Sequence, residues 1–281
     1  MHPLVRRAKS IRKALRERRE LAPAKVAIVS FPKSGRTWLR LLIGRALCQR
    51  HGLPESQILD TFALTRAAGI LSAVFSHDGT SNTEGRHLRR LDSGKRAFRG
   101  KRVLLLCRDP RDTVISCFFE ATRRKRVYDG TLSGFLRDPH YGIEKIVRFY
   151  ELWHAAQSVP EEMLIVSYEE LHADPAKVLR ETLGFLGATD FPGSIVSEAI
   201  EYGRFDNMRR LEQAGGLGEG SRLRPADASD ASSFKTRKGE VGGFAKTLSE
   251  ADLAFANRVL AESDCPLLAA YRGVRAHPPL G

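Results

Sequence analysis

The segment from Val26 to Trp38, VAIVSFPKSGRTW, constrains the fold of this chain more than any other. An apolar run rich in β-branched residues stops at Pro32, and Gly35 stands where the chain must turn. Apolar residues at helical spacing follow, so the pattern predicts a buried strand, a tight loop and a helix. Such a helix N-terminus attracts anions, and Lys33 adds a full charge. The loop is predicted to hold a phosphate or sulfate, with an ordinary turn and a solvated lysine as the alternative.

A second segment repeats the order strand, turn, helix. Val103 to Cys107 is a continuous apolar run, typical of a strand covered on both faces, and it ends at Arg108. Asp109 suits the N-cap of the next helix and Pro110 its first turn, which places Ser116 two turns into that helix. A guanidinium offers phosphate a bidentate fork and a hydroxyl adds one donor. A local salt-bridge cluster in the Arg-Asp-Pro-Arg-Asp turn is the alternative interpretation.

A third motif, Arg237-Lys238-Gly239 followed by Gly242, lies in a stretch rich in Gly, Asp and Ser. Residues 213–245 are predicted to form a long loop, and long loops in compact domains are usually lids or disordered segments. A flexible basic loop is the alternative.

In this order the three segments resemble the PAPS-dependent sulfotransferase family, of the cytosolic type. Its members move a sulfuryl group from 3′-phosphoadenosine 5′-phosphosulfate (PAPS) to an acceptor hydroxyl or amine. Pro-Lys-Ser-Gly-x-Thr-Trp resembles the family's 5′-phosphosulfate loop, whereas a nucleotide triphosphate loop needs its lysine after the second glycine. The resemblance implies that this part of the donor contacts Lys33, Ser34, Gly35, Arg36 and Thr37.

The resemblance also implies the ligands of the 3′-phosphate. Arg108 and Ser116 match the family's arginine and serine at the same spacing, and the loop that closes over the phosphate corresponds to Arg237, Lys238 and Gly239. The family usually continues this loop with an acidic residue and tryptophan, where this chain has Gly and Phe. That departure concerns the packing of the loop and leaves the phosphate contacts in place.

Smaller matches concern the nucleotide base. The resemblance implies that Trp38 stacks on the adenine, that Tyr168 lies near it, and that Phe205 of the Phe-x-x-Met element packs on it. Core packing is the alternative for Trp38 and Phe205. The family often has threonine where this chain has Gly203, which removes one hydrogen bond to the nucleotide.

Transfer of the group needs a base that takes the acceptor's proton, and histidine suits this role. Among His51, His77 and His87 we prefer His77, because it ends a short apolar run and so sits at a strand edge. Asp78 either orients His77 or caps the next segment. Some branches of the family use Glu instead. The resemblance further implies that Lys33 stabilises the leaving oxygen and that Ser116 engages Lys33 to restrain hydrolysis.

The predicted fold class is α/β, a P-loop-like three-layer sandwich. Strands near 26–31, 74–76, 103–107 and 163–167 alternate with helical stretches, which favours a mainly parallel central sheet with helices on both faces. Ligands are expected at the carboxyl edge of such a sheet. We divide the chain into a basic amphipathic segment at 1–24 and one domain at 25–281, with 213–245 as a cofactor-covering loop.

The formal net charge of +13 fits a polyanionic cofactor. No nucleic-acid fold is recognised, so nucleic acid is not a predicted partner. Residues 4–19 place apolar side chains between basic ones, and they either contact an anionic membrane surface or form a solvated helix. No apolar run suits a signal peptide or a membrane span, and four unpaired cysteines suit reduced thiols, so the predicted location is cytoplasmic.

No metal is predicted, and PAPS is the predicted donor. The alternatives are a P-loop-type nucleotide-dependent kinase, and a non-catalytic nucleotide- or membrane-binding protein. The acceptor is predicted to be a small or lipid-like molecule. The candidate apolar walls of its pocket are Phe62, Phe75, Phe119, Tyr128, Phe135 and Tyr141, with ordinary core packing as the alternative.

Overall fold

A computed structural model gives the structure of the chain at residues 17, 19–81, 85–215, 223, 227, 230, 233–236 and 239–272. The predicted membrane-contact segment at 4–19 lies almost entirely outside these described residues, as does about half of the predicted loop, including Arg237 and Lys238.

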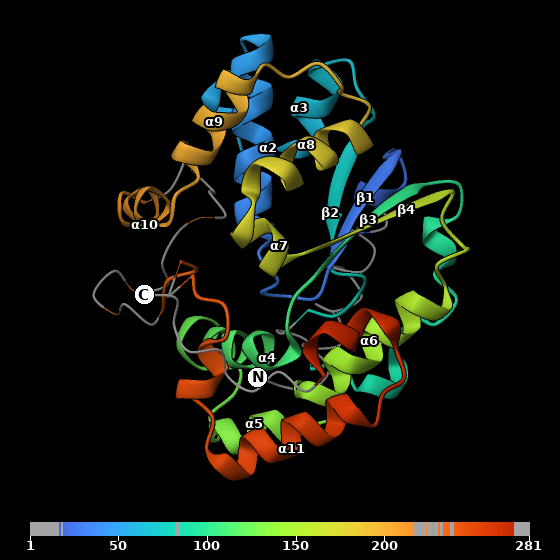
Figure 1. Cartoon of the computed structure of the whole chain (residues 1–281), viewed down its shortest axis with the longest axis vertical. Helices are drawn as coiled ribbons and strands as arrows, with labels where there is room; N and C mark the ends of the chain where they lie inside the picture. The colour runs from blue at the N-terminus through green and yellow to red at the C-terminus, as the bar shows by residue number, and fades with distance from the viewer. Residues whose placement is uncertain are drawn as a thin grey trace.

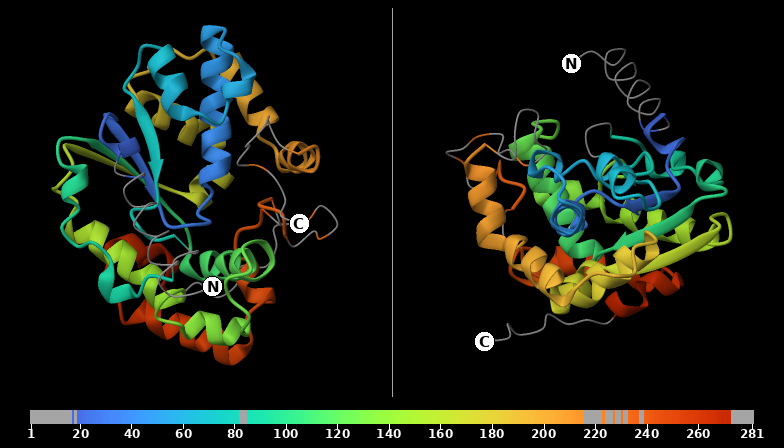
Figure 2. Two further views of the ribbon diagram at one scale, coloured as in Figure 1. Left: turned by 180° about the vertical axis from the view of Figure 1, so that it is seen from behind. Right: turned by 90° about the horizontal axis from the view of Figure 1, so that it is seen from above.

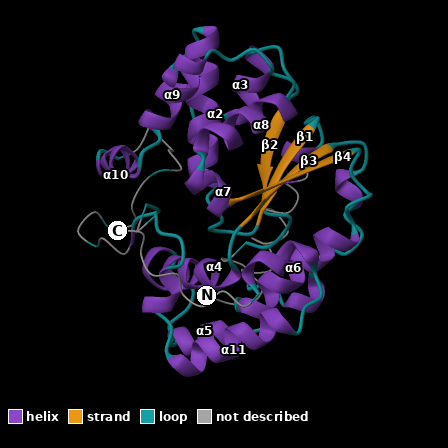
Figure 3. Cartoon of the chain, in the orientation of Figure 1, coloured by secondary structure: helices purple, strands orange, loops and turns teal. Residues whose placement is uncertain are grey.

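Four parallel strands form the sheet at the centre of the molecule (Figures 1 and 3). They are β1 (Val26–Ser30), β2 (Ala73–Ser76), β3 (Arg102–Cys107) and β4 (Glu162–Ser167), in the spatial order β2-β1-β3-β4. In the register Val29 pairs with Ser76 on one side and Leu105 on the other. All four strands lie where the sequence predicted them, and the predicted parallel α/β sheet is confirmed.

The two inner strands, β1 and β3, are buried on both faces, and their alternate residues point to opposite sides of the sheet. Ala27, Val29, Val103 and Leu105 join one apolar cluster, and the residues between them join another. Helices cover the two faces, as the views from behind and above show (Figure 2). One group contains α2 (Arg36–His51), α3 (Thr61–Ala67), α8 (Pro175–Phe185) and α9 (Gly193–Tyr202); the other contains α4 (Pro110–Phe119), α5 (Leu132–Arg137), α6 (Ile143–Ala155) and α11 (Glu250–Ala261).

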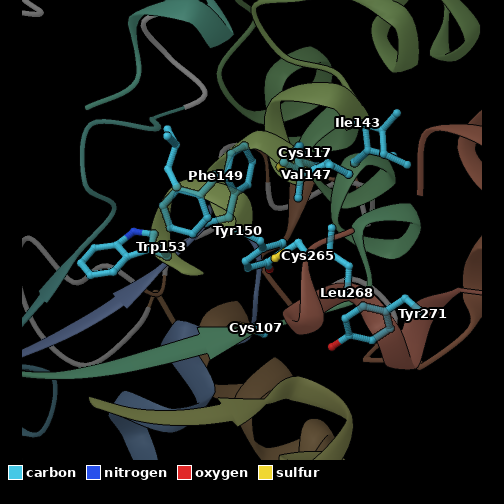
Figure 4. Packing of buried hydrophobic residues seen from close by; sticks show 14 of the residues in the cluster. Cys107, Cys117, Ile143, Val147, Phe149, Tyr150, Trp153, Cys265, Leu268 and Tyr271 are labelled. Atoms are coloured by element: carbon cyan, nitrogen blue, oxygen red, sulfur yellow. The ribbon is translucent and has the colours of Figure 1, made fainter. Parts of the chain in front are cut away.

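The cluster under α4 and α6 contains most of the largest buried apolar side chains of the described residues (Figure 4). Trp153 is fully buried there and packs edge-on against Phe98 and Phe149. All four cysteines are free and buried, and burial raises the pKa of the Cys107 thiol. Trp153 and the four cysteines are thus core residues.

Local signals in the second segment are also confirmed. Asp109 caps α4 by accepting a hydrogen bond from the N–H of Arg111, and Pro110 occupies the first turn. Two further helices are short. The helix α7 (Tyr168–Ala173) follows β4 directly, and α10 (Phe205–Gln213) begins at the Phe-x-x-Met element.

Candidate active site

A site residue follows the carboxyl end of every strand. Lys33 lies in the loop after β1, His77 comes directly after β2, Arg108 after β3, and Tyr168 after β4. Because the strands are parallel, these residues lie along one edge of the sheet in the order β2, β1, β3, β4. All four line a single cavity of about 620 Å³, to which Gly35, Arg36, Thr37, Trp38, Ser116, Phe205 and Gly239 also contribute. Ser34 is buried beneath the loop.

The loop between β1 and α2 depends on two left-handed residues. Lys33 has a φ of 70° and Gly35, the N-cap of α2, a φ of 90°. A Cβ at position 35 would lie 2.5 Å from Cδ2 of Tyr168, so glycine is needed both for its backbone conformation and for space. No acidic residue occupies the first turn of α2, which leaves its positive end suited to an anion.

Arg108 holds three segments together. Its Nη1 donates to the carbonyl oxygen of Lys33 at 3.0 Å and its Nη2 to that of Glu240 at 3.1 Å. The guanidinium lies 4.2 Å above the ring of Tyr168, and its Nη2 is 3.9 Å from the carboxylate of Asp112. One side chain therefore joins the phosphate-type loop to the segment that follows Gly239.

His77 has a defined tautomer. Its Nδ1 lies 3.0 Å from the carbonyl oxygen of Ser30, the last residue of the neighbouring strand. A carbonyl can only accept, so Nδ1 donates and the lone pair of a neutral imidazole is on Nε2. Glu17 fixes the backbone here, because its carboxylate accepts from the N–H groups of His77 and Asp78 at 3.0 and 3.1 Å.

The two other candidate bases, His51 and His87, do not line the cavity. His51 ends α2, and Nδ1 of His87 accepts a hydrogen bond from the N–H of Arg89. Asp78 forms a buried ion pair with Lys95. Burial raises the pKa of Asp78 to about 6, against the opposing charge of Lys95.

The β4 side of the cavity is aromatic. Trp38 packs edge-on against Tyr168, with ring centroids 6.0 Å apart, and against His172. Phe205 is 40% exposed, and a Cβ at Gly239 would lie 2.6 Å from its ring. We call Trp38, Tyr168, Phe205 and Arg108 the aromatic half of the cavity. At Gly203, a Cβ would lie 2.4 Å from Cδ2 of Leu42 and 3.2 Å from Nε1 of Trp38, so a larger residue here would need the Leu42 side chain to move.

Two buried carboxylates, of Glu212 and Asp112, hold the described residues of the loop that contains the third motif. Glu212, fully buried at the end of α10, accepts from the N–H groups of Lys235 and Thr236 at 2.7 and 3.0 Å, and from the Thr236 hydroxyl. On the far side Asp112 accepts from the N–H groups of Gly242 and Phe244. Between these anchors the carbonyl oxygen of Gly239 contacts His172 Nε2 at 3.1 Å.

The charged half of the cavity consists of Lys33, His77, Ser116 and Glu120. Glu120 was not predicted from the sequence, yet its carboxylate lies 3.0 Å from the Lys33 ammonium. Burial would raise the pKa of Glu120, but Lys33 and Arg124 outweigh it and lower the pKa to about 2. Burial also lowers the pKa of Lys235 well below its ordinary value, and Arg124 adds to this effect.

The predicted aromatic walls are only partly in place. Phe119 lines the cavity. Tyr128, Phe135 and Tyr141 instead pack on one another and on Phe118, in the layer of α4 to α6, and Phe75 lies under the guanidinium of Arg40. A ring at a strand edge and a ring on a packed helix give the same apolar pattern. The sequence therefore does not show which rings face a cavity.

This fold and site define a class of α/β proteins that bind anionic groups at the carboxyl edge of a parallel sheet through the loops that follow the strands. The profile of the sulfotransferase domain matches residues 23–263. The chain belongs to the sulfotransferase family.

Similar proteins and solved structures agree with this family assignment. The chain is 26% identical over 266 residues to cytosolic sulfotransferase 12 of Arabidopsis thaliana, covering 83% of this chain and 75% of the relative. It is 26% identical over 201 residues to human sulfotransferase 2A1, covering 65% and 66%. A mouse sulfotransferase complexed with PAP has the same fold, with a TM-score of 0.59, 20% identity and 89% of each chain covered. Retinol dehydratase in complex with retinol and PAP has a TM-score of 0.58 at 16% identity, with 91% and 84% covered.

Two features are absent from the part of the chain that the structure describes. No helix there combines the length and apolar character that a bilayer span requires. No group of three or more His, Cys, Asp or Glu side chains there has a metal-binding arrangement.

Proposed function

We propose that this sulfotransferase uses PAPS as its donor and transfers the sulfuryl group in line to an acceptor hydroxyl or amine, with His77 as general base. The observation that carries the proposal is the convergence of Lys33, His77 and Arg108 on one cavity, each from the end of a different parallel strand. The desulfated product is 3′,5′-adenosine diphosphate (PAP).

The residues fit such a donor. Two buried polar atoms at the cavity, Nε of Arg108 and Nε1 of Trp38, have no hydrogen-bond partner among the described residues, which suits a ligand rich in acceptors. Trp38, Tyr168 and Phe205 offer rings to a base, Arg108 and Ser116 suit a 3′-phosphate, and the loop from Lys33 to Thr37 suits the phosphosulfate. Arg237 and Lys238 remain proposed ligands of the 3′-phosphate.

The donor supplies an activated sulfuryl group. His77 Nε2 takes the proton of the acceptor hydroxyl while the acceptor oxygen bonds to sulfur. The bond between sulfur and the phosphate oxygen breaks, and Lys33 stabilises the negative charge that grows on that oxygen. The proton thus passes to His77, the sulfuryl group to the acceptor, and the electron pair of the broken bond to the phosphate oxygen. The Nδ1 bond to Ser30 keeps the imidazole in the tautomer that this step needs.

We propose a small-molecule acceptor and a cytoplasmic location. Among proteins of this fold, retinol dehydratase has been solved with androsterone or with retinol, and the relatives of Arabidopsis thaliana are named cytosolic. Membrane contact through residues 4–19, and the division of the chain into 1–24 and 25–281, stay predictions.

The test is calorimetric binding of PAP against 5′-AMP at one salt concentration. We expect PAP to bind more tightly than AMP, and Arg108→Ala to weaken PAP by about 10- to 100-fold, because charge-assisted hydrogen bonds to the 3′-phosphate are lost. AMP should weaken by a smaller factor, because Arg108 also contacts the loop at Lys33 and the ring of Tyr168. Arg45→Ala is a matched control: Arg45 also packs on a tyrosine ring, Tyr202, and pairs with two carboxylates, but lies outside the cavity. Equal binding of PAP and AMP by the unmodified protein would refute the proposed donor.

A further inference from the structure

The cavity has charged side chains where the sequence predicted rings for the acceptor. Of the aromatic residues predicted as its apolar walls, only Phe119 lines the cavity. Arg124 and Lys235 line it as well, and the proposed donor site uses neither of them. The surface that an acceptor meets is therefore cationic at least as much as it is apolar.

One helix places Arg124 relative to the reacting groups. The π-helical turn Glu120–Arg124 continues α4, on which Ser116 lies, and such turns often mark functional sites. Ser116 suits the 3′-phosphate, and Glu120, one turn later, lies 3.0 Å from Lys33, the lysine of the proposed leaving oxygen. Arg124 follows after one more turn, and all three side chains line the cavity. Along this helix the cavity therefore runs from the nucleotide, past the point of transfer, to Arg124.

Lys235 faces the same charges from another segment. Its main chain is fixed, because its N–H donates to the buried carboxylate of Glu212 at 2.7 Å. Burial lowers the pKa of Lys235 well below its ordinary value, and Arg124 lowers this pKa more than Glu120 raises it. The field at Lys235 is therefore positive, and a negative group bound beside these two cations would be stabilised by both.

We propose that Arg124 and Lys235 bind an anionic group of the acceptor, so that the acceptor is a small molecule with a carboxylate or phosphate in addition to the hydroxyl that receives sulfur. The guanidinium offers such a group a bidentate fork, and the ammonium adds a second cation. The inference rests on the proposed function and names its acceptor class. The transfer itself is unchanged: the hydroxyl oxygen bonds to sulfur and its proton passes to His77.

The first experiment compares acceptors that differ by one charge. Para-hydroxybenzoate, hydroxyphenylacetate and hydroxyphenylpropionate are each tested against the corresponding amide, and glycerol phosphate against glycerol, with PAPS as donor. We expect kcat/KM to be at least about tenfold higher for the anion in the best pair, the effect of one charge-assisted interaction. Equal use of both members, preference for the neutral ones, or no transfer to any anion would overturn the proposal.

Variants then assign the preference to these cations. Arg124→Gln should raise KM for the preferred anion by about tenfold, with kcat nearly unchanged, because a contact remote from sulfur binds substrate and transition state alike. The neutral partner should change by less than about threefold. Arg124→Lys should keep most of the preference, and Lys235→Gln should reduce it. Arg123→Gln is the matched control, because Arg123 is the adjacent residue but is exposed and lies outside the cavity.

PAP affinity separates an acceptor site from a second donor site. Arg124→Gln should bind PAP within about threefold of the unmodified protein, since it loses only a longer-range attraction. A tenfold loss of PAP affinity would assign Arg124 to the donor and overturn the proposal, as would an equal loss of activity toward anionic and neutral acceptors. Failure of the unmodified protein to prefer PAP over AMP would instead count against the donor, so the two failures are distinguishable.

Discussion

The two halves of the cavity are built in different ways. The aromatic half depends on backbone geometry: Gly35 and Gly239 have positive φ angles and leave room for the rings of Tyr168 and Phe205. The charged half depends on side chains that reach across from separate elements, as Lys33 does to Glu120 and His77 to Ser30. We therefore expect binding of the nucleotide base to depend on main-chain shape and transfer to depend on side-chain chemistry, so substitutions should separate these two functions.

The largest effect should come from the charged half. We expect His77→Ala to lower turnover by about 10²- to 10⁴-fold, the usual contribution of a general base, while PAP affinity changes little. Turnover is measured with an acceptor found by screening small alcohols, phenols and amines with PAPS, and affinity by calorimetry.

His87→Ala is the control for this prediction, because His87 belongs to the same interval of the sequence but does not line the cavity. Turnover within about threefold of the unmodified protein would remove His77 from the role of base. A parallel loss of PAP affinity would show instead that the two halves are not separable.

An intermediate effect is expected in the aromatic half. Gly35 and Gly52 flank the same helix, α2, and both have positive φ, but only a Cβ at position 35 meets another residue, Tyr168. Each change to alanine should cost about 1–2 kcal/mol of stability from the backbone alone. Gly35→Ala should in addition weaken PAP binding by at least tenfold, because Tyr168 or the loop must shift.

Thermal unfolding and PAP titration of the two variants test this expectation. Gly52→Ala supplies the backbone cost without the collision. If both variants bind PAP equally well, the close approach of Gly35 to Tyr168 does not shape the nucleotide site.

The contrast between main-chain geometry and contacts of distant side chains also explains which features the sequence predicts. The strands, the turn at Gly35 and the cap at Asp109 depend on neighbours within a few residues, so composition and spacing predict them. The family resemblance named Lys33, Arg108 and Trp38, and the strand-edge pattern favoured His77; the structure brings all four to one cavity.

Contacts between distant residues leave no such pattern. Glu17 reaches the N–H of His77, 60 residues away, and Glu120 pairs with Lys33, which lies 87 residues before it in the chain. An acidic residue four positions after Ser116, on the same helix, was a usable signal for Glu120. Phe135 and Tyr141 were named as candidate pocket walls because an apolar pattern does not distinguish a ring that faces a cavity from one that faces the core.

The smallest effect should come from Glu212, whose buried carboxylate ties α10 to Lys235 and Thr236. Gln keeps one carbonyl oxygen but turns an NH₂ toward groups that are themselves donors, so Glu212→Gln should loosen this anchor. The two cations that the resemblance assigns to the 3′-phosphate follow Thr236 directly in the chain. PAP affinity should therefore fall by about three- to tenfold, whereas AMP, which lacks that phosphate, should bind as before.

The ratio of PAP to AMP affinity is the decisive measurement, because a general loss of folding would weaken both nucleotides alike. Glu201→Gln serves as the control, since Glu201 is exposed and pairs only loosely with Arg204, at 3.7 Å. A reduced ratio in Glu212→Gln would mean that main-chain anchoring extends from the base to the 3′-phosphate. An unchanged ratio with a lower melting temperature would limit Glu212 to stabilising α10, and the recognition of the 3′-phosphate would then depend on Arg108 and its helix alone.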